Sequence, residues 1–118
     1  MAVIRPFAAL RPAEQYAEKV ISLPYDVMDR DEASELAAGN PLSFLHISRS
    51  EIDLPHIADP HCPEVYEKAK SNLEDFVSRG ILIREKQTSL YVYRQTMDGR
   101  IQTGICGCVS VDEYLEEK

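Results

Sequence analysis

Long apolar runs and paired cysteines are both missing from this sequence. No stretch approaches the roughly 18 apolar residues that cross a bilayer, and the N-terminus lacks the apolar core of a signal peptide. The three cysteines are an odd number without the spacing of a disulfide framework. Free thiols are typical of reducing compartments, so the cysteines predict a cytoplasmic protein. The lack of a long apolar run predicts that the protein does not interact with membranes.

Basic residues are also too few for a protein that binds polyanions. The formal net charge is −7, and an acidic surface repels phosphate-rich partners. This argues against general nucleic-acid binding but leaves room for a small local basic pocket. The composition, 44% hydrophobic and 28% charged, is typical of a folded globular protein, and the length of 118 residues fits a single domain.

Several catalytic and metal-binding motifs are absent. The segment TGICG lacks the Lys-Ser/Thr pair of a phosphate-binding P-loop, and neither a G-x-S-x-G elbow nor an H-E-x-x-H motif occurs. Cys106 and Cys108 would share one face of a strand and could hold a metal together, but a structural zinc requires four ligands. We predict no metal site and interpret both cysteines as small core residues.

Helix signals occur in three places. The first helix would cover residues 12–21, with its proline in the first turn. Asp29 and Glu32 form a capping-box pattern at the start of a second helix, which Gly39 ends. The third helix covers residues 63–80 and also begins at a proline. The buried stripe of the second helix would consist of Ala33, Leu36 and Ala37.

Strand signals predict a small mixed sheet. Residues 2–4 have strand composition, and the apolar segment 43–48 (SFLHIS) predicts a buried strand. Residues 90–97 and 100–111 predict a hairpin closed by the two-residue turn Asp98-Gly99. Both hairpin faces carry apolar groups, so we expect it at the centre of the sheet. We therefore predict an α+β fold, a small mixed β-sheet including a C-terminal hairpin with about three helices packed on it.

The segment LPYDV, residues 23–27, carries the first candidate site residues. Tyr25 and Asp26 are either presented to a ligand or serve only to brace the loop between two helices. His46, inside the predicted strand, is either a structural histidine or a general base or anion contact. If strand 43–48 lies beside the loop, these side chains would form one polar cluster with three further candidates, Asn40, Ser43 and Arg49.

The order and spacing of five segments then point to a family. They are VIRPFAALRP, LPYDV, NPLSFLHISRSEIDLP, LYVYRQTM and QTGICGCVSVDEY. Together they closely resemble the start of the bacterial and archaeal family catalogued as domain of unknown function 1015, over essentially all of the chain. The positions that match the family's pattern are Pro24, Tyr25, Asp26, Asn40, Pro41, Ser43, His46, Arg49, Glu51 and Gly104.

This resemblance carries expectations about the whole protein. Family members are longer, so the chain is expected to be an N-terminal piece whose first partner is the C-terminal part of the same protein. Members often neighbour serine-biosynthesis genes, and their N-terminal region has a faint likeness to the ParB and sulfiredoxin-like fold, which includes free-serine kinases. No catalytic residue can be aligned from that fold, and no cofactor is indicated.

Two functions compete at this point. In the first, the domain belongs to an enzyme, such as a small-molecule kinase, and binds a small polar or phosphorylated metabolite or a nucleotide. Asp26 and His46 would be catalytic, and Tyr25, Asn40, Ser43 and Arg49 would bind the ligand. In the second, it is a non-catalytic docking or homo-oligomerisation module with an exposed apolar patch. That patch would surround Tyr91, Tyr93 and Ile105.

Overall fold

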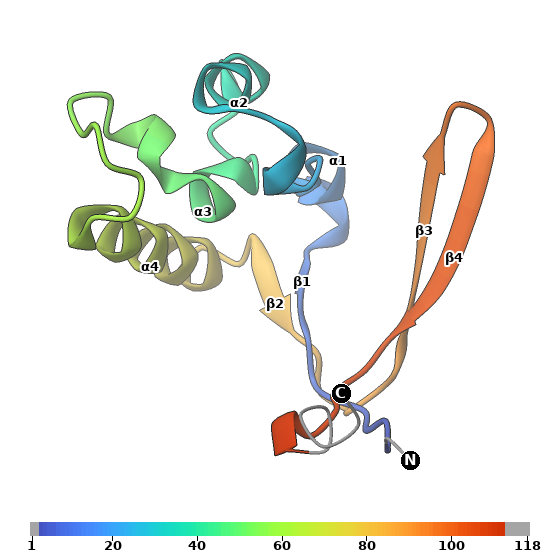
Figure 1. Cartoon of the computed structure of the whole chain (residues 1–118). Helices are drawn as coiled ribbons and strands as arrows, with labels where there is room; N and C mark the ends of the chain where they lie inside the picture. Colours follow the sequence, from blue (N-terminus) through green and yellow to red (C-terminus); the bar gives the residue numbers. More distant parts are fainter. Residues whose placement is uncertain (1–2, 113–118) are drawn as a thin grey trace. The chain divides into compact units, whose positions relative to one another are not determined.

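A computed structural model describes residues 3–112 of the chain (Figure 1). Contacts between residues divide the chain into two units. The helical unit covers Arg11–Ile83, and the described part of the hairpin unit combines residues 3–10 with residues 84–112. The short strands β1 (Leu10–Pro12) and β2 (Leu82–Arg84) pair with each other in a two-stranded sheet.

The helical unit is built from short helices followed by one long helix. Figure 1 shows α3 next to α4, with α2 following the α1 segment. In chain order the elements are η1 (Glu14–Tyr16), α1 (Ala17–Val20), η2 (Tyr25–Val27), α2 (Arg30–Ala37), α3 (Leu45–Ser48), η3 (Ser50–Asp53) and α4 (Pro63–Ser78).

Helix α2 begins at the predicted capping box. Asp29 Oδ1 accepts the backbone N–H of Glu32 at 2.8 Å, and Glu32 Oε1 accepts the backbone N–H of Asp29 at 3.4 Å. Gly39, with a φ of 74°, follows the helix end. The predicted buried stripe is only partly right, because Ala33 and Ala37 are buried whereas Leu36 is 55% exposed.

Helix α4 confirms the third predicted helix. Pro63 occupies its first turn, where the missing N–H costs no helical hydrogen bond. Gly80, with a φ of 72°, ends it. Val65 and Phe76 are buried on one side of the helix. The apolar periodicity of residues 63–80 therefore predicts correctly that the segment is a helix, that it begins at Pro63 and that it ends before Gly80.

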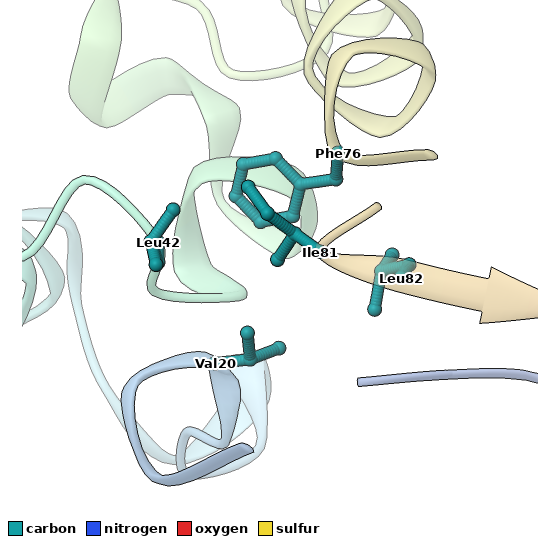
Figure 2. Packing of buried hydrophobic residues seen from close by; sticks show 5 residues of the cluster. All are labelled: Val20, Leu42, Phe76, Ile81 and Leu82. Atoms are coloured by element: carbon teal, nitrogen blue, oxygen red, sulfur yellow. The ribbon is translucent and has the colours of Figure 1, made fainter. Parts of the chain in front are cut away.

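Two apolar clusters form the core of the helical unit. In the first, side chains from α1, the loop before α3, α4, and β2 with the residue before it point toward one another (Figure 2). Its buried members are Val20, Leu42, Phe76, Ile81 and Leu82. The second joins α2 to α3 and contains Met28, Ala33, Ala37 and Leu45.

The predicted strand at residues 43–48 is wrong, because a turn at its start leads into α3 (Leu45–Ser48). Leu42 and Leu45 are both buried although three residues apart, which fits a helical turn but not the alternation of a strand. Ser43 Oγ accepts the backbone N–H of Leu45 at 3.2 Å, and His46 N–H donates to Ser43 O at 3.1 Å. A short apolar run cannot distinguish a buried strand from a buried helix, so local hydrogen bonding decided the outcome.

The predicted strand at residues 2–4 is also not found. Val3 and Ile4 belong to no strand, and Ala2 lies outside the described residues. Pairing begins at Arg5, which exchanges backbone hydrogen bonds with Cys108 at 2.8 Å, and at Phe7, which does so with Ser89 at 3.0 Å. The first helix also starts later than predicted, since residue 12 ends β1 and η1 begins at residue 14.

The C-terminal hairpin forms in the predicted register. Strands β3 (Tyr91–Met97) and β4 (Arg100–Cys106) are antiparallel, with Val92 opposite Ile105 and Thr96 opposite Ile101. The turn residues Asp98 and Gly99 have φ values of 52° and 78°, as a two-residue hairpin turn requires. The α+β class with a C-terminal hairpin is therefore confirmed.

The expectation that the hairpin occupies the centre of a sheet is wrong for the described chain. Within residues 3–112, β3 and β4 form a sheet of two strands, separate from the β1–β2 pair. Val92, Ile101 and Ile105 are 63–73% exposed on one face. On the other face the ring of Tyr93 covers Gly104, where a Cβ would overlap that ring. Also within residues 3–112, no helix is long and apolar enough to cross a membrane.

Tyr91 fastens the base of the hairpin to the N-terminal segment. Its hydroxyl donates to Phe7 O and accepts the backbone N–H of Ala9, both at 3.0 Å, and its ring lies 5.0 Å from that of Phe7. Replacing Tyr91 with Phe removes the hydroxyl and leaves the backbone N–H of Ala9 without its acceptor, whereas Phe7 O keeps the hydrogen bond from the backbone N–H of Ser89. We expect the free energy of unfolding to fall by about 1–2 kcal/mol, measured by denaturant unfolding.

The matched control is Tyr93→Phe in the same strand. The Tyr93 hydroxyl has no hydrogen-bond partner among the described residues, so its removal should change stability by less than about 0.5 kcal/mol. Equal losses in the two variants would show that the Tyr91 hydroxyl does not hold the segment.

Candidate functional site

Tyr25 and Asp26 lie on the 3₁₀ turn η2, before α2. Pro24 precedes the turn, and its carbonyl accepts the backbone N–H of Val27 at 3.3 Å. Both side chains are exposed, Tyr25 by 58%. Asp26 makes no hydrogen bond or ion pair with the described part of the chain, so the interpretation that it braces its own loop is wrong.

Arg49, rather than Asp26, braces this loop. Its Nη2 donates to Met28 O at 2.7 Å, two residues after Asp26. Its Nη1 lies 3.2 Å from Oε1 of Glu51, a carboxylate in a residue only 4% exposed. The Arg49 Nε is buried and has no partner among residues 3–112. Arg49, itself in a largely buried ion pair with Glu51, thus holds the residue that directly follows the segment LPYDV.

His46 is held on both sides of its ring. Nδ1 lies 2.8 Å from Asp53 Oδ1, and Nε2 lies 3.0 Å from Asn40 O. Asn72 of α4 donates to Asp53 Oδ2 at 3.0 Å and to His46 O at 2.6 Å. Both ring nitrogens of His46 therefore contact oxygen atoms of the protein in this geometry.

Ser43 and Asn40 serve the turn into α3. Ser43 is 4% exposed, and its hydroxyl accepts the N–H of Leu45. The Asn40 side chain donates to Lys19 O at 2.8 Å and accepts the N–H of Leu42 at 3.2 Å. The structure therefore brings Asn40 and His46 together and places Arg49 against the loop, while the side chains of Tyr25 and Asp26 face solvent.

Arg30 is a structural residue that the sequence did not single out. From the first turn of α2 its guanidinium donates to Ile57 O, to Leu54 O at 2.7 Å and to Glu51 O at 3.0 Å. These contacts hold the irregular segment that follows η3. The sequence does not indicate this role for Arg30, because an arginine on an exposed helix turn usually points into solvent.

Two of the concavities on the helical unit are lined in part by polar side chains. The wider is shallow, about 550 Å³, and is lined by Leu54, Pro63, Glu64, Glu67, Lys68 and Ser71. The pKa of Glu64 lies below its usual value because the carboxylate accepts the residue's own backbone N–H, with a further hydrogen bond from Cys62. The narrower cleft, about 350 Å³, is lined by Lys19, Gly39, Asn40, Pro41, Leu42 and Arg79. Of the six predicted site residues, only Asn40 lines either.

The cysteines do not have the core positions predicted for them. Cys106 and Cys108 are exposed, Cys62 is half-buried, and all three are free thiols. Among residues 3–112, no group of three or more His, Cys, Asp or Glu side chains gathers where a metal could bind.

Besides the two clefts, the outer edge of β4 could bind a partner. In an antiparallel ladder closed by a two-residue turn, the pair beside the turn is hydrogen-bonded and the next pair points its N–H and C=O groups outward. By this rule Ile101, Thr103 and Ile105 direct their backbone groups to the free edge. Ile101 and Ile105 are 63% and 66% exposed.

The family model described as "Protein of unknown function (DUF1015)" matches residues 4–118. No curated protein matches the chain, and no solved structure does.

Proposed function

The chain belongs to the DUF1015 family, whose function is unknown, and we propose that it is a homodimerisation module that pairs through the outer edge of β4. The observation that carries this proposal is the edge at Ile101, Thr103 and Ile105, which is exposed at both isoleucines and pairs with no other strand of residues 3–112. Exposed strand edges are templates for pairing with another chain. A two-stranded hairpin is only marginally stable alone, and additional strands with an apolar face stabilise it.

The β4 edge is complementary to itself. An antiparallel β4–β4 pair with its two-fold axis at Thr103 would place Thr103 opposite its own copy and Ile101 opposite Ile105 of the other protomer. Thr–Thr and β-branched apolar pairs are favourable across strands. On the opposite face Arg100 would meet Cys106, so no two like charges oppose each other.

The β3 edge lacks this complementarity. An axis at its centre would place Arg94 opposite its own copy, and like charges directly opposite destabilise a strand pair. Arg94 makes no ion pair with the described residues that would neutralise it. The second copy therefore occupies the β4 edge, and the dimer sheet has the order β3-β4-β4-β3.

The test places like charges on the proposed pairing positions. The double variant Ile101→Lys, Ile105→Lys sets lysines opposite each other twice across the axis, whereas in the monomer these positions face the uncharged Thr96 and Val92. We expect dimerisation to weaken at least about tenfold, measured by sedimentation equilibrium over a concentration series.

The matched control is the double variant Val92→Lys, Thr96→Lys. It places the same charges on the same hairpin face but on β3, away from the axis, and should change the dimer dissociation constant by less than about threefold. A wild-type chain that stays monomeric at all concentrations, or equal effects of both double variants, would contradict the proposal.

A second candidate function is the binding of a small polar or phosphorylated metabolite. Its support is the narrower cleft, which contains Asn40, one of the predicted ligand residues. Four further expectations stay predictions. They are catalysis by Asp26 and His46, ligand contacts from Tyr25, Ser43 and Arg49, a C-terminal partner segment, and a cytoplasmic location. An Asp26→Asn variant with the same enzymatic activity as the wild-type protein would contradict the predicted catalytic role of Asp26.

A further inference from the structure

The narrower cleft is lined by a core residue and by residues that hydrogen bonds connect to each other. Its floor includes Leu42, a buried member of the first core cluster, which packs with Val20 and Phe76 (Figure 2). On the rim, the Asn40 amide joins Lys19 O to the N–H of Leu42. In addition, Phe44 N–H donates to Val20 O at 2.9 Å. The two segments that form this side of the cleft are therefore tied together before any ligand binds.

The donors of the cleft are two cations and a backbone amide. Lys19 has no carboxylate partner, and the N–H of Gly39 has no acceptor, among residues 3–112. Arg79 uses Nη1 to contact Asp75 Oδ2 at 3.0 Å, which leaves further guanidinium donors. Two cations at one cleft are notable in a chain whose net charge is −7.

The end of α4 next to Arg79 would by itself repel an anion, because carbonyl oxygens carry the negative end of a helix dipole. Here those carbonyls are capped. Gly80 N–H donates to Val77 O at 3.1 Å, and Ile81 N–H donates to Phe76 O at 2.9 Å. Lys and Arg also interact favourably with a helix C-terminus, so the cations offset the remaining negative potential.

We infer that this cleft binds the phosphate group of a small metabolite through Lys19 and Arg79. The volume of about 350 Å³ is at the small end of known ligand sites and suits a compact phosphate monoester. Charge-assisted hydrogen bonds from ammonium and guanidinium groups are the usual contacts to phosphate. The inference deepens the second candidate function, rests on it, and is independent of the β4 dimer.

The experiment is an amide NMR titration of the whole chain with inorganic phosphate, in parallel with chloride at equal ionic strength. Phosphate should shift the amides of Gly39, Asn40 and Leu42 saturably, and chloride should not. Lys19→Met should weaken phosphate binding about tenfold or more. The control Lys70→Met removes an exposed lysine of α4 outside the cleft and should leave the affinity within about twofold.

Three results would overturn the inference: shifts that do not saturate, shifts scattered over the surface, or equal effects of Lys19→Met and Lys70→Met. If phosphate misses the cleft but a phosphorylated metabolite shifts amides near His46 and Arg49, the cleft assignment fails while the second candidate function survives. Unperturbed amide positions elsewhere in Lys19→Met will show that the variant is folded.

Discussion

Replacing Glu51 with Ala is expected to lower the free energy of unfolding by about 3 kcal/mol. The Glu51 carboxylate is the partner of Arg49, and the pair lies largely inside the helical unit, with side-chain exposures of 5% and 20%. Removing the acid leaves the guanidinium charge of Arg49 without its counter-ion, and the Nε of Arg49 already lacks a partner among the described residues. Denaturant unfolding of the two proteins measures the difference.

The surface pair Asp75–Arg79 is a matched control for this prediction. Its N–O distance of 3.0 Å is similar, but both side chains are more than half exposed. Exposed ion pairs contribute little, so Asp75→Ala should cost less than about 1 kcal/mol. Similar losses from Glu51→Ala and Asp75→Ala would show that burial of the Arg49 pair is not what stabilises the loop before α2.

Replacing Arg30 with Ala should cost about 3 kcal/mol and loosen the segment after η3. Three backbone carbonyls, those of Glu51, Leu54 and Ile57, accept hydrogen bonds from this one guanidinium. Bonds to a charged donor contribute about 1.5–3 kcal/mol each, and a shared donor makes them non-additive. Hydrogen exchange should accelerate over residues 50–59 by more than in the rest of the helical unit.

Arg30→Lys separates charge from geometry. A lysine keeps the positive charge but not the planar fork that reaches several carbonyls at once, so it should recover less than half of the stability lost in Arg30→Ala. Full recovery would mean that charge alone holds the segment, and uniform acceleration of exchange across the unit would mean that Arg30 has no local role.

The hairpin and α2 were predictable because their determinants are local. The turn Asp98-Gly99 sets the register of fourteen strand residues on its own, and Asp29 with Glu32 closes a capping box within three residues. Residues 43–48 were mispredicted because the run SFLHIS has no period that separates strand from helix. The hydrogen bonds of Ser43 and the burial of Leu45 settle that segment as a helix.

The sequence does not predict the hydrogen-bond and ion-pair partners of the candidate site residues. His46 and Arg49 were selected as chemically capable side chains, yet each is bound to partners within the unit, Asp53 and Asn40 O for His46 and Glu51 and Met28 O for Arg49. These partnerships depend on how the chain folds back on itself. Lys19 and Arg79, sixty residues apart in the sequence, meet at one cleft for the same reason.

Mixing two oppositely charged variants tests the account of the β4 edge most directly. One protein carries Ile101→Lys and Ile105→Lys, the other Ile101→Glu and Ile105→Glu, so that only the mixed dimer pairs unlike charges across the axis. Sedimentation equilibrium should find each variant monomeric alone and the equimolar mixture dimeric. A mixture that remains monomeric at concentrations where the wild-type chain dimerises would contradict pairing through β4.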